Sequence, residues 1–151
     1  MASRTSTTPT DADRTEIAAQ LRIAIARAAR GLRQQAGSEL TPSQASVLAT
    51  VARHGPLTPS ELAERERISR PTITRLIAKL DRKGLVAFIP DPADGRSYRV
   101  TVSPAGAALR SDRKARSDAY LARVLRGADA GELALLGDAA ELLERLLAGE
   151  A

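Results

Sequence analysis

The side chains best suited to chemistry in this sequence are cations and hydroxyls clustered between residues 69 and 79. A guanidinium can bind phosphate or donate two parallel hydrogen bonds to guanine, and a threonine can contact base edges or a thymine methyl group. No Asp or Glu lies between Arg67 and Asp81, so no neighbouring carboxylate neutralises this stretch. An ordinary solvated helix face is the alternative interpretation. The residues expected to contact nucleic acid here are Ser69, Arg70, Pro71, Thr72, Thr74, Arg75 and Lys79.

A second candidate group lies in the turn-rich segment that follows. Asp94, Gly95, Arg96 and Ser97 would sit at or beside the tip of a hairpin. An arginine at such a tip can enter the minor groove, whose negative potential attracts it. We expect Asp94 to bond Arg96 or a turn N–H and so fix the direction of the guanidinium. A simple Asp-Gly turn with an exposed arginine is the alternative.

Charge is distributed unevenly along the 151 residues, whose formal net charge is +5. Residues 65–99 carry nine basic and four acidic side chains, whereas residues 127–151 carry one arginine and six carboxylates. A basic middle segment beside an acidic end predicts a surface that binds a polyanion. A composition rich in arginine would also produce part of this clustering.

Several functional classes are excluded by what the sequence lacks. With no Cys, it has no disulfide, thiolate metal site, cysteine nucleophile or thiol redox sensor. The single histidine, His54, cannot form a histidine-pair metal site and is interpreted as a helix C-terminal residue. The sequence shows no glycine-rich phosphate loop and no clustered carboxylates, so we expect neither an enzyme nor a cofactor. Without a membrane-length apolar run or signal peptide, we expect a soluble cytoplasmic protein.

The elements that must position these groups are mostly helices with clear start signals. Thr41-Pro and Thr58-Pro are each followed by Gln44 or Glu61 at the third helical position, which predicts two capping boxes. A helix from about Asp13 should precede them, after a mobile tail over residues 1–12.

The next helix should start after Ser69 and end at Gly84. Strands over 85–89 and 96–102 follow, joined by the turn Pro-Asp-Pro-Ala-Asp-Gly. A helix-turn-helix beside a hairpin predicts a winged helix-turn-helix over residues 39–103. The helix from Ser69 should bury one apolar stripe, made of Ile73, Leu76, Ile77 and Leu80.

Two long helices, 104–126 and about 130–147, complete a fold that is mainly α with a small β-hairpin. Residues 13–38 and 104–150 are expected to dimerise the chain, because both carry apolar bands wider than a monomer usually exposes. Packing on the chain's own domain is the alternative. The candidate dimer contacts are Ile17, Leu21, Leu136, Leu143 and Leu147. A small-molecule effector could bind where the first and fifth helices meet, near Arg22, Arg30 and Tyr120.

Two segments, ISRPTITRLIAKLDRKGLV and DPADGRSYRVTVSPAG, together resemble the MarR (multiple antibiotic resistance regulator) family. The resemblance implies an obligate homodimer that binds pseudo-palindromic double-stranded DNA, usually represses nearby genes and is released by a small ligand. At Ala93 and Gly95 members often carry basic residues, so this wing is less basic than the family pattern. An architectural DNA binder or a protein-interaction module with the same fold, without an effector, is the alternative.

Overall fold

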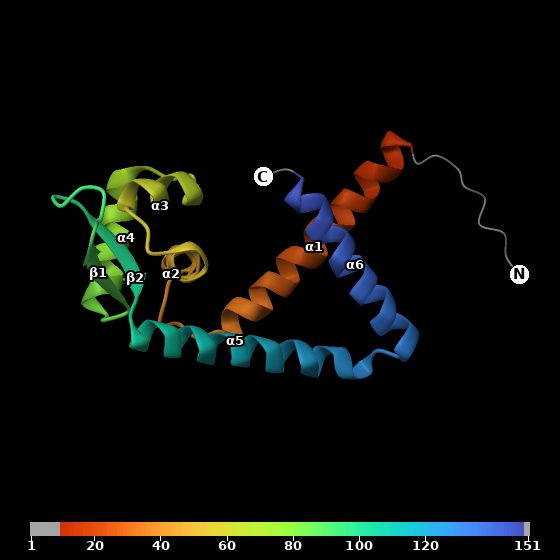
Figure 1. Ribbon diagram of the computed structural model, residues 1–151. Coiled ribbons are helices and arrows are strands. Elements are labelled where there is room, and N and C mark those ends of the chain that lie inside the picture. Colours follow the sequence, from red (N-terminus) through yellow and green to blue (C-terminus); the bar gives the residue numbers. More distant parts are fainter. Residues whose placement is uncertain (1–9, 150–151) are drawn as a thin grey trace, which may run out of the picture.

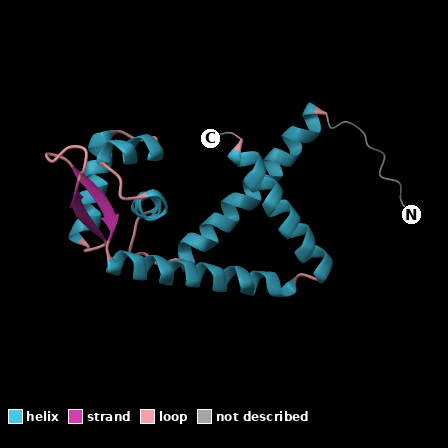
Figure 2. Ribbon diagram, in the orientation of Figure 1, coloured by secondary structure: helices cyan, strands magenta, loops and turns pink. Residues whose placement is uncertain are grey.

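The computed structural model describes residues 10–149, which form six α-helices, one short 3-10 helix and one antiparallel hairpin (Figures 1 and 2). The elements in chain order are α1 (Asp11–Gln35), α2 (Pro42–His54), α3 (Pro59–Glu66), α4 (Arg70–Arg82), β1 (Val86–Pro90), β2 (Tyr98–Val102), α5 (Pro104–Val124), η1 (Leu125–Gly127) and α6 (Ala130–Ala148).

The first helix begins two residues earlier than the sequence analysis expected. Thr10 is its N-cap: the Thr10 hydroxyl accepts from the Asp13 backbone N–H, and the Asp13 carboxylate accepts from the Thr10 N–H at 2.8 Å. Asp11 and Asp13 also place negative charge at the positive end of the helix dipole. The start at Asp13 was therefore wrong. Residues 1–9 of the expected tail lie outside the described residues.

Capping boxes at the starts of α2 and α3 are confirmed. Thr41 and Gln44 exchange hydrogen bonds at 3.0 and 3.3 Å, and Thr58 and Glu61 do so at 2.7 and 3.2 Å. At the end of α4, Gly84 adopts a φ of 69°, and the N–H groups of Gly84 and Leu85 donate to carbonyls in the last helical turn. This arrangement is a Schellman motif, which requires the left-handed conformation that glycine adopts most readily.

The core of the described residues lies inside the winged helix-turn-helix. The four apolar residues predicted for α4 are all buried there, and α4 packs against α2, α3 and β1. Burying each of these side chains contributes about 1.5–3 kcal/mol. The core residues are Leu40, Val47, Leu48, Val51, Leu57, Leu62, Ile73, Leu76, Ile77, Leu80, Leu85, Val86 and Val100.

The hairpin is present, with the first strand shifted by one residue and the second strand two residues shorter than expected. β1 pairs with β2 in the register Val86↔Val102 to Pro90↔Tyr98. The second strand starts at Tyr98, because Ser97 donates its N–H to the Asp94 carbonyl at 2.8 Å and so belongs to the turn. The turn is therefore longer than the sequence pattern indicated.

Helix α5 connects the winged helix-turn-helix to the remaining helices (Figure 1). One end of α5 adjoins β2, α1 packs against α5, and α6 leaves the other end after η1. In Figure 2 the long helices α1, α5 and α6 extend away from the sheet. The winged helix-turn-helix, residues 39–103, is thus a compact unit, called the head below. The long helices beside it have an open arrangement.

The start of α5 is held closely against the head. Gly106 lies in its first turn, where an added Cβ would collide with the Leu85 carbonyl oxygen. The Ser103 hydroxyl donates to the Gly84 carbonyl at 2.6 Å and accepts from the Gly106 N–H at 3.0 Å. These contacts leave no room for a side chain at position 106.

We expect Gly106→Ala to destabilise the fold by about 1–3 kcal/mol, because α5 must shift away from the head. Gly137→Ala is the matched control, since nothing lies within 4 Å of the added methyl group. The control should stabilise α6 by about 0.5–1 kcal/mol. Urea unfolding of both variants measures the difference. An unfolding midpoint unchanged by Gly106→Ala would contradict the close packing of α5.

Candidate nucleic-acid interface

Helix α4 separates its apolar side chains from its cations. Ile73, Leu76, Ile77 and Leu80 face the core. The predicted contact residues lie on the other faces. Ser69, Arg70, Pro71, Thr74, Arg75 and Lys79 are exposed, and Thr72 is half-buried.

Hydrogen bonds within α4 order the side chains near its N-terminus. The Ser69 and Thr72 hydroxyls lie 2.9 Å apart, and the Arg75 guanidinium donates weakly to Thr72 at 3.4 Å. The Thr74 hydroxyl donates to the Arg70 carbonyl at 3.0 Å, and its oxygen can still accept hydrogen bonds. Arg75 is thus oriented along the helix toward the end that enters the major groove in helix-turn-helix proteins.

The turn between α3 and α4 holds a cation that the sequence analysis did not select. Arg67 has a φ of 53°, a left-handed conformation that residues other than glycine adopt at a cost. Its side chain is exposed, two residues before the N-cap of α4. From the sequence, Arg67 was only one of the basic residues of segment 65–99, because a sequence does not show backbone angles.

At the wing tip, Asp94 stabilises the turn through the backbone. Its carboxylate accepts from the Arg96 N–H at 3.0 Å, which is the turn contact that the sequence analysis gave as one of two options. Asp94, Gly95 and Arg96 are exposed and Ser97 is half-buried. The wing tip therefore presents the Arg96 side chain from a turn that Asp94 holds in place.

The base of the wing contains an ion pair with a buried carboxylate, which the sequence analysis missed. Asp91 is 8% exposed, accepts from the Ala93 N–H at 3.1 Å and pairs with Arg99 at 3.0 Å. Arg99 also donates to the Pro56 carbonyl at 3.3 Å and lies 3.6 Å from Glu61. This network ties the wing to the start of α3. The segment around Asp91 looked like turn chemistry only, so sequence alone gave no signal for a long-range partner.

Hydrogen bonds lower the pKa values of both carboxyls in this network. The pKa of Asp91 is lowered first by the Ala93 backbone N–H and next by Arg99. The pKa of Glu61 is lowered chiefly by the backbone N–H and hydroxyl of Thr58, with a smaller contribution from Arg99. Both groups therefore stay ionised at neutral pH.

The long helices expose most of their apolar side chains. Across the described residues, neither α1 nor α6 contains a buried residue. Ile17, Leu21, Leu136 and Leu147 are exposed, by 55%, 38%, 51% and 65%, and Leu143 is half-buried. These are the positions named as dimer contacts.

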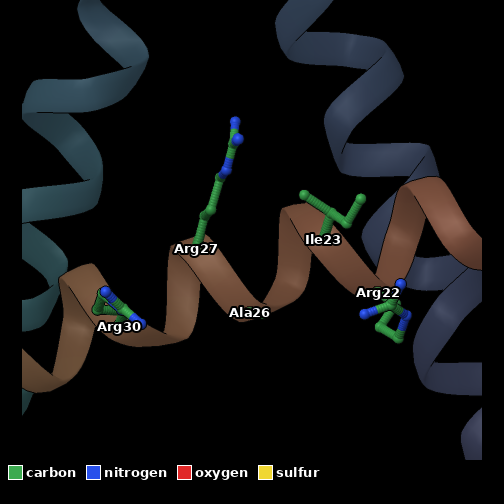
Figure 3. A pocket seen from close by; sticks show the side chains of 5 residues that line it. All are labelled: Arg22, Ile23, Ala26, Arg27 and Arg30. Atoms are coloured by element: carbon green, nitrogen blue, oxygen red, sulfur yellow. The ribbon is translucent and has the colours of Figure 1, made fainter.

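The three expected effector residues do not lie in one hollow. Arg22 and Arg30 line a hollow along α1 with Ile23, Ala26 and Arg27 (Figure 3). Tyr120 instead packs over Gly31, where an added Cβ would collide with the phenol, and the Arg123 guanidinium lies 5.5 Å from its ring.

A second hollow, of about 360 Å³, lies where α1 ends, α2 begins and α5 passes. It adjoins both the head and the long helices. Its lining residues are Arg33, Gly37, Leu40, Pro42, Ala45, Ser46 and Arg113.

Comparison with known proteins identifies this architecture. The model of the MarR family matches residues 38–97, and an HTH-type transcriptional regulator of Mycobacterium bovis is 40% identical over 133 residues, which cover 87% of this chain and 92% of that protein. The chain belongs to the MarR family. It is accordingly a transcriptional regulator with the helix-turn-helix DNA-binding fold of that family.

Other relatives agree with the assignment as a transcriptional regulator. The crystal structure of a transcriptional regulator of Pseudomonas aeruginosa superposes with a TM-score of 0.82 at 34% identity, covering 92% of this chain and 98% of that one. The transcriptional repressor NicR of Pseudomonas putida is 34% identical over 90 residues, 59% of this chain and 57% of its own. Within residues 10–149, no helix is long and apolar enough to cross a membrane.

We expect Asp91→Asn to lower stability at pH 7 and to have less effect at pH 3. A carboxyl whose pKa is lowered by folding stabilises the protein above its unfolded pKa of about 4, and this contribution is lost as the pH falls. Urea unfolding at the two pH values measures the difference. Asp118→Asn, which breaks an exposed pair with Lys114, is the control and should change little at either pH. If Asp91→Asn lowers the free energy of unfolding equally at both pH values, the charge of Asp91 is not the cause of its stabilising effect.

Proposed function

We propose that this MarR-family protein is a homodimeric repressor that binds a pseudo-palindromic operator and responds to a small ligand. The observation that carries the proposal is the exposed face of α4. Arg70, Thr74, Arg75 and Lys79 are all exposed there, while the opposite face is buried in the core. Such a face combines phosphate-binding cations with groups that can read base edges.

Dimerisation is supported by the exposed apolar side chains of α1 and α6. A second copy is the partner that would remove them from water, because a contiguous apolar surface of this kind is rarely left open. In this proposal residues 39–103 are the DNA-binding head, and residues 13–38 and 104–150 form the dimer. Two heads related by a two-fold axis would read two half-sites about one helical turn apart.

Repression and ligand response complete the proposal. A relative named as a repressor, similar over 59% of this chain, supports repression. The hollow at the junction of α1, α2 and α5 supports ligand response, because a molecule bound there would touch both the head and the dimer helices. The hollow at Arg22 and Arg30 is lined by α1 alone, so a ligand bound there would act less directly on the heads.

Selection of DNA from a randomised pool, followed by footprinting, tests sequence-specific binding. We expect a short protected palindrome with half-sites about 10 bp apart. Arg75→Ala should cost about 1–3 kcal/mol of binding free energy at one base position in each half-site and relax the base preference there.

Arg96→Ala should weaken binding to every sequence, most where A·T tracts narrow the minor groove, and the effect should shrink at high salt.

Lys114→Ala is the matched control for charge, because Lys114 is a highly exposed cation on α5 and not on the head. This substitution should leave both the affinity for DNA and the base preference nearly unchanged. Uniform protection of all sequences by the wild-type protein would support an architectural DNA binder instead and contradict the proposal.

Replacing Leu143 and Leu147 together with Glu should give monomers and abolish operator binding, since each monomer would hold only one half-site. Sedimentation velocity and a gel-shift titration measure the two effects. Ala134→Glu is the control: it is exposed, and nine residues from Leu143 place it on the opposite side of α6 at 100° per residue. A wild-type protein that sediments as a folded monomer at micromolar concentration would contradict the dimer.

A further inference from the structure

The linker between α1 and α2, residues 36–41, contacts charged groups of α5 and of the residue that directly follows α4. The Glu39 carboxylate accepts from Arg116 at 3.0 Å and from Arg113 at 3.4 Å, and both arginines belong to α5. The Arg113 side chain is 15% exposed and the Glu39 side chain 42% exposed, so the arginine is shielded from water while the carboxylate is partly open to it. Glu39 thus ties the linker to the long helix.

The same linker is bonded at two further points. Arg113 donates to the carbonyls of Ala36 and Gly37 at 3.0 and 3.1 Å, which satisfies acceptors at the end of α1. Lys83, directly after α4, donates to the Glu39 carbonyl at 2.9 Å. One residue, Glu39, therefore contacts α5 through its side chain and the end of α4 through its backbone.

The conformation of the linker favours this arrangement. Gly37 has a φ of 86°, and an added Cβ there would collide with the Glu39 carboxylate. Hydrogen bonding to its own backbone N–H and to Arg116 lowers the pKa of Glu39, so the carboxylate stays charged at neutral pH. The linker is thus folded tightly around an ionised group.

We propose that Glu39 is a positioning residue that sets the angle between the DNA-binding head and the dimer helices, and with it the operator half-site spacing that the dimer prefers. The inference rests on the proposed operator-binding dimer. Lys83 lies at the end of α4 that is opposite to the reading end. A rotation of about 10° over the roughly 20 Å length of α4 moves the reading end by about one base-pair rise, 3.4 Å.

Binding to a series of operators, in which the half-site spacing is changed by one base pair at a time, tests this role. Glu39→Gln keeps the shape of the side chain and removes its charge. We expect the affinity ratio between the best spacing and its neighbours to fall about threefold or more, with the sedimentation coefficient of the dimer unchanged. Arg116→Gln removes only one of the two arginine partners of Glu39, the one that is more exposed than Arg113, and should give a smaller fall. This second variant keeps the test open if Glu39→Gln folds poorly.

Asp118→Asn is the matched control, because it breaks the Lys114–Asp118 pair on the same helix without touching the linker. Its affinity at each half-site spacing (its spacing profile) should match that of the wild type. A loss of affinity for Glu39→Gln that is equal at every spacing, or a profile unchanged in both Glu39→Gln and Arg116→Gln, would overturn the inference. A wild-type protein without any spacing preference would contradict the proposed function itself, and the inference with it.

Discussion

The burial of one stripe of α4 is the constraint on which the rest of the structure depends. Its four apolar side chains occupy the centre of the head, against α2, α3 and β1. Because the stripe fixes the rotation of the helix about its axis, it also fixes which side chains point outward. The exposure of Arg75 and Lys79 is thus a direct consequence of core packing. A helix with its cations on the same face as its leucines could not fold here, since burying unpaired charges costs more than the apolar contacts supply.

Several carboxylates around the head are engaged in structural contacts of their own. Asp91 and Glu61 surround Arg99, Glu39 binds two arginines of α5, and Glu66 accepts from the hydroxyls of Ser46 and Thr50. These contacts hold the wing, the linker and α3 in place. Because these carboxylates are bonded to other groups, they do not pair with the cations of α4. The same ion pairs that stabilise the head therefore help to preserve its positive outer face.

The long helices serve a different purpose from the head. Their apolar residues contribute little to the core of a single chain, and α5 is the element that joins them to the head. Its start is fixed by the close approach of Gly106 to the Leu85 carbonyl, and its middle is fixed by Arg113 and Arg116 at the linker. Two attachment points on one helix resist rotation better than one. This gives the proposed dimer a physical means of holding two heads at a defined separation.

Local chemistry determined most of the fold from sequence alone. Capping residues such as Thr41 and Thr58 marked the helix starts, Gly84 marked an end, and the spacing of four apolar residues identified the buried face of α4. These signals act over three or four residues, so they are visible in a sequence. Tertiary structure alone decided which distant groups meet. Arg113 reaches a carboxylate 74 residues away, and Tyr120 packs on Gly31 instead of joining Arg22 and Arg30, because such contacts depend on how helices cross and not on the residues beside them.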